Sequence, residues 1–308
     1  MFVDHNVYIL GAGFSADAGI PVLDNFLVKM RAGMNWLREE GRDREFAAIR
    51  NVFKFRKKAA SAALRVNLNL ENIEDLFSLA AASGQYPLEE SVSTAIAGTL
   101  DFSRRTGKLQ WFEIMVDDDL AKPSSWTAKS KENVGATRYI IPPYDLYAGL
   151  LTGRICSPSK FMKNTIITLN YDTVLEEALG NWKIPFWYGF KPRSVEYDAS
   201  SKWARENPDD ALTILKLHGS VNWAKSKRSR GRLNVYGSYS DVLKVDGRVV
   251  LIPPTWRKSF QGPLSEVWNA AIQALSEATR VVIIGFSVPP TDIHFSTCSQ
   301  RAFKRTFL

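Results

Sequence analysis

A glycine-rich loop that joins a strand-like run to a helix-like pattern constrains the fold of this chain more than any other feature. The loop runs from Gly11 to Pro21 with the sequence Gly-Ala-Gly-Phe-Ser-Ala-Asp-Ala-Gly-Ile-Pro, directly after the apolar run Val7–Leu10. A patterned stretch from Leu23 to Leu37 follows it. Strand, glycine turn and helix is the layout that places backbone N–H groups and a helix N-terminus against a phosphate. It predicts an anion-binding turn after the first strand.

The glycine spacing alone leaves a second interpretation open. Gly11 and Gly13 lack a Cβ atom, so the chain can turn sharply there and approach an anion closely. The dinucleotide fingerprint has a third glycine three residues later, where this chain has Ala16. A plain strand-to-helix turn therefore explains the Gly-Ala-Gly string as well as a nucleotide site does.

Recurring runs of strand length predict an α/β core. Five apolar runs are Val7–Leu10, Thr165–Leu169, Leu212–Leu217, Val249–Ile252 and Val281–Ile284. Because they are apolar on both faces, they are typical of a parallel sheet covered by helices. Apolar residues recur at helical spacing in Arg44–Leu68, Ile73–Ala82, Leu88–Arg105, Pro142–Leu151 and Leu264–Ala278.

These segments predict a Rossmann-like parallel sheet with a helical subdomain inserted after the first strand. We expect residues 1–308 to form one domain, in which the helical insertion covers residues 40–150. Residues 107–141 are expected to be a loop or an extended arm, docked by Trp111, Phe112 and Trp126. Residues 189–210 and 224–248 are expected to be irregular insertions or hairpins.

The cysteine content argues against a metal site. Cys156 and Cys298 are the only cysteines, whereas a cysteine-rich zinc module needs four ligands in paired short spacings. Two lone cysteines are typical of a reducing compartment. No stretch approaches the ~18 apolar residues of a membrane span. With no leader-like pattern at the N-terminus, the sequence predicts a cytoplasmic protein without a membrane anchor or bound metal.

The formal charge of +8 is concentrated in two runs. One is Lys54–Lys58, and the other is Lys225–Arg232, in which five of eight residues are basic. Such runs suit a nucleic-acid or polyphosphate contact. A solvated basic loop is the alternative, since no aromatic residues interleave with the second run.

The full loop string resembles the nucleotide-binding loop of the sirtuin superfamily, which binds NAD on a Rossmann-like sheet. Three further stretches agree with that family in its own order: Thr168–Asp172 (Thr-Leu-Asn-Tyr-Asp), Lys216–Ser220 (Lys-Leu-His-Gly-Ser) and Ile283–Ser287 (Ile-Ile-Gly-Phe-Ser). Four motifs in order span nearly the whole chain and identify it as sirtuin-like.

The resemblance implies roles for individual residues. Asn170 corresponds to the catalytic asparagine and His218 to the general base, although a lone histidine in an arbitrary sequence is more often structural. Asp172 is either a further catalytic group or the cap of the next helix. The residues that the resemblance places around NAD are Gly11, Ala12, Gly13, Phe14, Ser15, Gly19, Gly285 and Ser287. For Gly285 and Ser287, an ordinary strand exit is the alternative.

The chain departs from protein-deacylating sirtuins at two points. Val22, Leu23 and Asp24 stand where those enzymes have an aromatic residue and an arginine, and two cysteines cannot build their four-cysteine zinc ribbon. The segment Asn72–Phe77 instead resembles a divergent prokaryotic branch of the superfamily. That resemblance implies NAD hydrolysis in antiphage defence, in a homo-oligomer or with a sensing partner such as an Argonaute-like protein or a translocase-type ATPase.

The expected function is therefore NAD+ hydrolysis to nicotinamide and ADP-ribose, with Asn170 and His218 at the centre. Two alternatives remain open. The first is a regulatory module that binds NAD or ADP-ribose without turnover, which would be free to lose both residues. The second is an NAD-dependent protein deacylase, against which the absent zinc ribbon argues.

Overall fold

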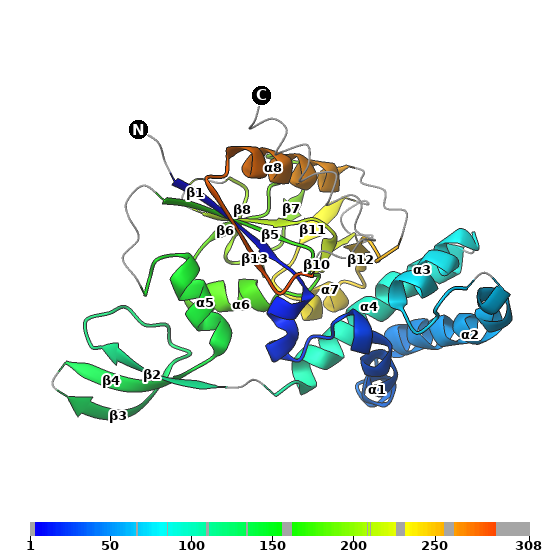
Figure 1. Ribbon diagram of the computed structural model, residues 1–308, viewed down its shortest axis with the longest axis horizontal. Helices are drawn as coiled ribbons and strands as arrows, with labels where there is room; N and C mark the ends of the chain where they lie inside the picture. The colour runs from blue at the N-terminus through cyan, green and yellow to red at the C-terminus, as the bar shows by residue number, and fades with distance from the viewer. Residues whose placement is uncertain are drawn as a thin grey trace.

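A parallel sheet of six strands, in the order β13-β1-β5-β9-β6-β8, forms the centre of the molecule (Figure 1). The computed structural model describes residues 4–287 except 66, 85, 109–110, 134, 156–161, 208, 210, 226–231 and 256–261. The strands are β1 (Asp4–Leu10), β5 (Met162–Thr168), β6 (Phe186–Trp187), β8 (Ala204–Arg205), β9 (Leu212–Lys216) and β13 (Arg280–Ile284). The sheet confirms the predicted Rossmann-like α/β class and four of the five predicted strands.

The strand order places the four motifs at one edge of the sheet. From β1 the chain continues on one side to β5 and β9, and it returns on the other side of β1 as β13. All of these pairings are parallel, with Val7 opposite both Thr165 and Val281. A reversal of this kind opens a crevice at the carboxyl ends of the strands, which is where open α/β sheets bind ligands.

Helices cover both faces of the sheet (Figure 1). Helix α8 (Pro263–Glu277) lies on one face, and α5 (Pro143–Leu151) and α6 (Val174–Asn181) lie on the other. Both α5 and α8 begin with proline, whose fixed φ suits the first helical turn. The buried side of α8 follows helical spacing through Leu264, Val267, Trp268, Ala271, Ala274 and Leu275.

The first strand leads into a bundle of helices. Two 3-10 helices come first and four α-helices follow: η1 (Ala12–Ala18), η2 (Leu23–Asn25), α1 (Phe26–Glu39), α2 (Asp43–Arg65), α3 (Ile73–Ala82) and α4 (Tyr86–Thr106). Small residues allow close packing here, because a Cβ at Gly33 would lie 3.0 Å from the Phe102 ring, and one at Gly98 would lie 2.8 Å from Cβ of Glu45. The predicted helices are confirmed with boundaries within a few residues.

Residues 112–141 form a small antiparallel sheet, so the prediction of a loop or arm was wrong. Its strands are β2 (Phe112–Asp117), β3 (Thr127–Asn133) and β4 (Ala136–Ile141), in the order β2-β4-β3. Only Val116 of β2 is buried, and a strand exposed on both faces lacks the apolar alternation by which strands are recognised. Trp126 does dock, 5.3 Å from Trp182 between ring centroids, whereas Trp111 and Phe112 are exposed.

A second sheet has four strands. It consists of β7 (Glu196–Tyr197), β10 (Gly219–Lys225), β11 (Leu233–Val235) and β12 (Arg248–Leu251), with helix α7 (Tyr239–Lys244) between the last two. The predicted strand Val249–Ile252 therefore exists, but it pairs with β10 and not with the parallel sheet. Gly219 permits β10 to begin directly after β9, because its φ is +83° and a Cβ would lie 2.2 Å from the Val250 carbonyl.

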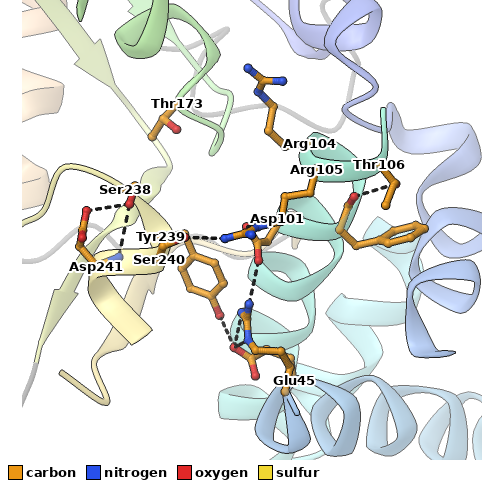
Figure 2. Close-up of polar contacts among 12 residues, drawn as sticks. Glu45, Asp101, Arg104, Arg105, Thr106, Thr173, Ser238, Tyr239, Ser240 and Asp241 are labelled. Atoms are coloured by element: carbon orange, nitrogen blue, oxygen red, sulfur yellow. Dashed lines mark hydrogen bonds and ion pairs between the residues drawn. The ribbon is translucent and has the colours of Figure 1, made fainter. Parts of the chain in front are cut away.

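Charged side chains join the helical bundle to the rest of the chain (Figure 2). Arg42 binds the carboxylates of Glu45 and Asp101, both at 2.8 Å. The hydroxyl of Tyr239 on α7 donates to Glu45 at 2.8 Å, and Arg105 donates to Ser240 at 2.6 Å. The carboxyl end of α4 is thereby fixed beside α7. None of the helices in the described part of the chain is long and apolar enough to cross a membrane.

Candidate functional site

A cavity of about 640 Å³ lies at the carboxyl edge of the parallel sheet. The four motifs meet in it, contributing Gly11, Ala12, Gly13, Leu169, Asn170, Tyr171, Asp172, His218, Gly285, Phe286 and Ser287. The remaining wall consists of Ile20, Pro21, Val22, Leu23, Asp24, Phe26, Ile73, Glu74, Leu100 and Pro254. A groove of about 680 Å³ lined by residues of α1 and α2 contains none of the motif residues, so the chemistry belongs to the cavity at the sheet edge.

The two glycine loops are packed against each other. The Gly11 amide donates to the Ile284 carbonyl at 3.0 Å, and the Gly13 amide donates to the Gly285 carbonyl at 2.8 Å. A Cβ at Gly11 would lie 2.5 Å from the Gly285 carbonyl oxygen. The glycines are therefore required for the contact between the β1 and β13 loops. Their two amides, which we expected to surround a pyrophosphate, donate within the protein.

Three of the residues predicted around NAD do not line the cavity. Phe14 is buried in η1, with its ring 5.3 Å from that of Tyr144. Ser15 is buried behind the cavity wall, and Gly19 ends η1 with a φ of +84° against Gly107. Phe14 and Gly19 shape the loop, whereas Ser15 contacts the polar residues of the site directly.

Tyr144 of α5 clamps the glycine loop from outside the motifs. Its hydroxyl donates to the Phe14 carbonyl at 2.8 Å and accepts from the Ala18 amide at 3.1 Å. Both ends of η1 are thus held by one phenol. A tyrosine beyond the four motifs carries no sequence signal for this role.

We expect Tyr144→Phe to destabilise the fold and weaken NAD binding, because it removes both hydrogen bonds without changing the packing of the ring. The loss should be about 1–3 kcal/mol in the free energy of unfolding, since a buried amide and a carbonyl lose their partner. Urea denaturation and titration calorimetry with NAD measure the two effects. Tyr147→Phe is the matched control, because that ring packs on Phe14 from a half-exposed position on the same helix. Equal stabilities of the two variants would contradict the clamp.

Asn170 is held in place by the glycine loop. Its Nδ2 group donates to the Gly11 carbonyl at 2.8 Å and to Oγ of Ser15 at 3.1 Å. The Ser15 hydroxyl in turn donates to Oδ1 of Asp172 at 3.1 Å. With both amide hydrogens used, the carboxamide has a single orientation in which Oδ1 is the atom that can accept from a ligand.

Asp172 caps the next helix, which was one of the two interpretations of its sequence position, while its catalytic role stays a prediction. Its Oδ1 accepts from the Val174 amide at 3.1 Å and so caps α6, and the residue also lines the cavity. Burial raises the pKa of its carboxyl above the ordinary value, against the opposing effects of the Lys216 ammonium and the Val174 amide. The cap and the polar network of the site share one carboxylate.

Replacing Asp172 by asparagine is expected to stabilise the fold at neutral pH. Because the folded-state pKa is raised, the stability due to Asp172 is present below its unfolded pKa and is lost as pH rises through the folded pKa. Asparagine keeps an oxygen for Ser15 and Val174 without a buried charge. We predict a higher Tm than wild type at pH 7, and a difference that closes toward acid pH. Differential scanning fluorimetry across pH tests this, and a lower Tm at pH 7 would contradict it.

His218 lies beside two aromatic rings. Its ring centroid is 6.2 Å from that of Tyr171 and 6.4 Å from that of Trp268. Trp268 is anchored by its indole N–H, which donates to the Leu217 carbonyl at 2.9 Å, and Tyr171 by its hydroxyl, which donates to the Ile252 carbonyl at 2.6 Å. The imidazole is buried yet lines the cavity. Trp268 carries no signal for this role in the sequence, because α8 shows only ordinary helical periodicity.

Among the residues that the structure describes, no group of three or more His, Cys, Asp or Glu side chains is arranged to hold a metal ion. Cys156 and Cys298 lie outside those residues, as does His294. His5 is in the sheet, where Nε2 is 2.9 Å from Oγ1 of Thr165. The residues with polar side chains that line the cavity are Asp24, Glu74, Asn170, Tyr171, Asp172, His218 and Ser287.

Comparison with known proteins identifies a family for part of the chain. Residues 164–305 match the family model of the SIR2-like domain. This part of the chain is a SIR2-like domain, which is the domain of the sirtuin-like superfamily. The SIR2-like segment begins on β5 and contains Asn170, Asp172, His218, Gly285 and Ser287, whereas the glycine loop precedes it.

One solved structure similar to this sirtuin-like chain is that of Sir2 in complex with the inhibitor EX-527, 2'-O-acetyl-ADP-ribose and a deacetylated p53 peptide. It is 13% identical, with a TM-score of 0.34, over 96% of this chain and 77% of that chain. This similarity is too low to add to the family assignment. The comparison with curated proteins gave no significant match.

Proposed function

We propose that this sirtuin-like chain hydrolyses NAD+ to nicotinamide and ADP-ribose. The observation that carries the proposal is the convergence of Asn170, Asp172 and His218 with two glycine loops on one cavity. Its volume of about 640 Å³ falls within the range of cofactor sites. The NAD contacts proposed there are Gly11, Ala12, Gly13, Gly285 and Ser287, with Phe14, Ser15 and Gly19 supporting the loop.

The proposed reaction breaks the bond between ribose C1′ and the nicotinamide nitrogen. The bonding electrons go to the pyridinium nitrogen, so nicotinamide leaves as a neutral molecule and needs no general acid. Asn170 Oδ1 accepts a hydrogen bond from a ribose hydroxyl or from the attacking water. Water adds its oxygen to C1′, and His218 takes the proton that the water gives up. The aromatic rings beside His218 keep other water away from the reacting carbon.

The biological role that we propose is NAD depletion in antiphage defence. The segment Asn72–Phe77, which resembles that branch of the superfamily, lies beside the site: Asn72 caps α3, and Ile73 and Glu74 line the cavity. We propose that assembly with further copies or with a sensing partner activates the chain. The basic run Lys225–Arg232, proposed to contact a partner or nucleic acid, lies outside the described residues except for its two end positions.

Nicotinamide release tests the proposed activity. Purified protein is incubated with NAD, and nicotinamide and ADP-ribose are quantified by chromatography, for the chain alone and for assemblies isolated from its native cells. Equimolar nicotinamide and ADP-ribose are expected. Tight NAD binding without either product, in every assembly, would favour the regulatory module. Nicotinamide release only with an acylated peptide would favour a deacylase.

A further inference from the structure

A buried ion pair lies directly beneath the candidate site. Lys216, the last residue of β9, places its ammonium 2.9 Å from Oε1 of Glu176 on α6, and their side chains are only 2% and 7% exposed. Removing two charges from water costs several kcal/mol per ion, so a buried pair is a poor way to gain stability alone. Hydrophobic residues of similar size could fill this position.

The lysine also binds the main chain of the site. The Lys216 ammonium donates to the carbonyl oxygen of Asp172 as well as to Glu176. The Tyr188 hydroxyl donates to the same Glu176 oxygen at 3.2 Å and accepts from Asn222 at 3.3 Å. The ammonium is therefore held by the Asp172 carbonyl on one side and by Glu176 on the other. Lys216 precedes His218 by two residues in the chain.

We propose that Lys216 is a positioning residue for NAD cleavage, which holds the Asp172 segment so that its carboxylate meets Ser15 and thereby orients Asn170. The inference rests on the proposed function. Backbone hydrogen bonds already join the two loops, from Leu217 to Thr168 and from Val221 to Tyr171, both at 2.9 Å. These contacts fix the main chain on either side of Asn170. Lys216 adds the contact at Asp172 itself.

The charges around Asp172 indicate a second effect of the lysine. Lys216 opposes the rise that burial imposes on the pKa of Asp172, whereas Glu176 reinforces it. The remaining titratable groups near Asp172 in the cavities on its two sides are Asp24, Glu74, Asp101, Arg104, Arg105, Tyr144, Tyr171, Glu177, His218 and Tyr239. Without Lys216 the carboxylate would ionise at a higher pH.

Three variants separate positioning from simple stability. Glu176→Gln is the control, since it removes one charge but keeps an oxygen for Tyr188 and leaves the Lys216 contact to Asp172. Lys216→Met leaves a buried, uncompensated carboxylate and is expected to destabilise the protein. The double variant Lys216→Met with Glu176→Gln removes both charges and is expected to recover Tm relative to Lys216→Met.

Cleavage and binding are then measured on the folded double variant and on Glu176→Gln. We expect kcat of the double variant to stay about 10²-fold below that of Glu176→Gln, as for a site displaced by about 1 Å. We also expect its kcat to fall at a higher pH on acidification, because Asp172 is protonated at a higher pH without Lys216. Equal kcat and equal pH profiles would overturn the inference while leaving NAD hydrolysis intact.

If the wild type releases no nicotinamide, the proposed function fails, and calorimetry with NAD decides the inference. At least tenfold weaker NAD binding by the double variant supports it, and equal affinities overturn it.

Discussion

Alanine at Asn170 or at His218 is expected to lower NAD cleavage by at least about 10²-fold, the usual cost of losing a positioning group or a general base. Asn170→Ala removes the carboxamide that the Gly11 carbonyl and Ser15 hold in one orientation. His218→Ala removes the proposed base from beside Tyr171 and Trp268. Both are measured as nicotinamide release by an assembly in which the wild type is active.

Two comparisons make the result specific. His5→Gln is the control for the histidine, because His5 is equally buried but bonds to Thr165 within the sheet, away from the cavity. It should keep its cleavage rate per folded molecule. Asn170→Asp should behave like the alanine variant, since a carboxylate cannot donate to the Gly11 carbonyl. Near-wild-type turnover by Asn170→Ala and His218→Ala would place the reaction elsewhere.

A methyl group at Gly285 is expected to be the most damaging small substitution in the loops. An added Cβ would lie 2.1 Å from the Phe14 amide nitrogen, and the residue has a φ of +62°. Left-handed backbone costs an ordinary residue about 1–2 kcal/mol, and overpacking adds about 1–3 kcal/mol. We therefore expect Gly285→Ala to lower the free energy of unfolding by about 2–5 kcal/mol and to abolish NAD binding, because the β1 and β13 loops must separate.

Gly41→Ala provides the matched control for this prediction. Gly41 has nearly the same φ, +66°, but nothing lies within 4 Å of an added Cβ. It should show only the backbone cost and retain NAD affinity. Denaturant unfolding and calorimetry of the two variants separate the effect of the close loop contact from the backbone cost. Similar losses of stability and NAD affinity in both variants would show that the close contact between the β1 and β13 loops is unimportant for them.

Patterns within a few residues were enough to predict four strands of the parallel sheet, most helices and the four motif loops. An apolar run such as Val7–Leu10 can be buried on both faces only in a covered sheet, and parallel strands bring their carboxyl ends to one edge. The motif order on those strands therefore predicts that Asn170, Asp172 and His218 lie at one site. That residues 1–308 form one domain with an insertion at 40–150 stays a prediction.

Pairing and side-chain contacts required the fold, because they join residues that are distant in sequence. An apolar run such as Val249–Ile252 looks the same in either sheet, and only its partner β10 assigns it. Tyr144 meets Ala18 across 126 positions, Trp268 meets Leu217 across 51, and Lys216 meets Glu176 across 40. No periodicity or motif records such contacts, since burial and hydrogen-bond partners arise only when strands and helices pack. The motif spacing thus located the cavity, whereas packing determined which side chains hold its polar groups in place.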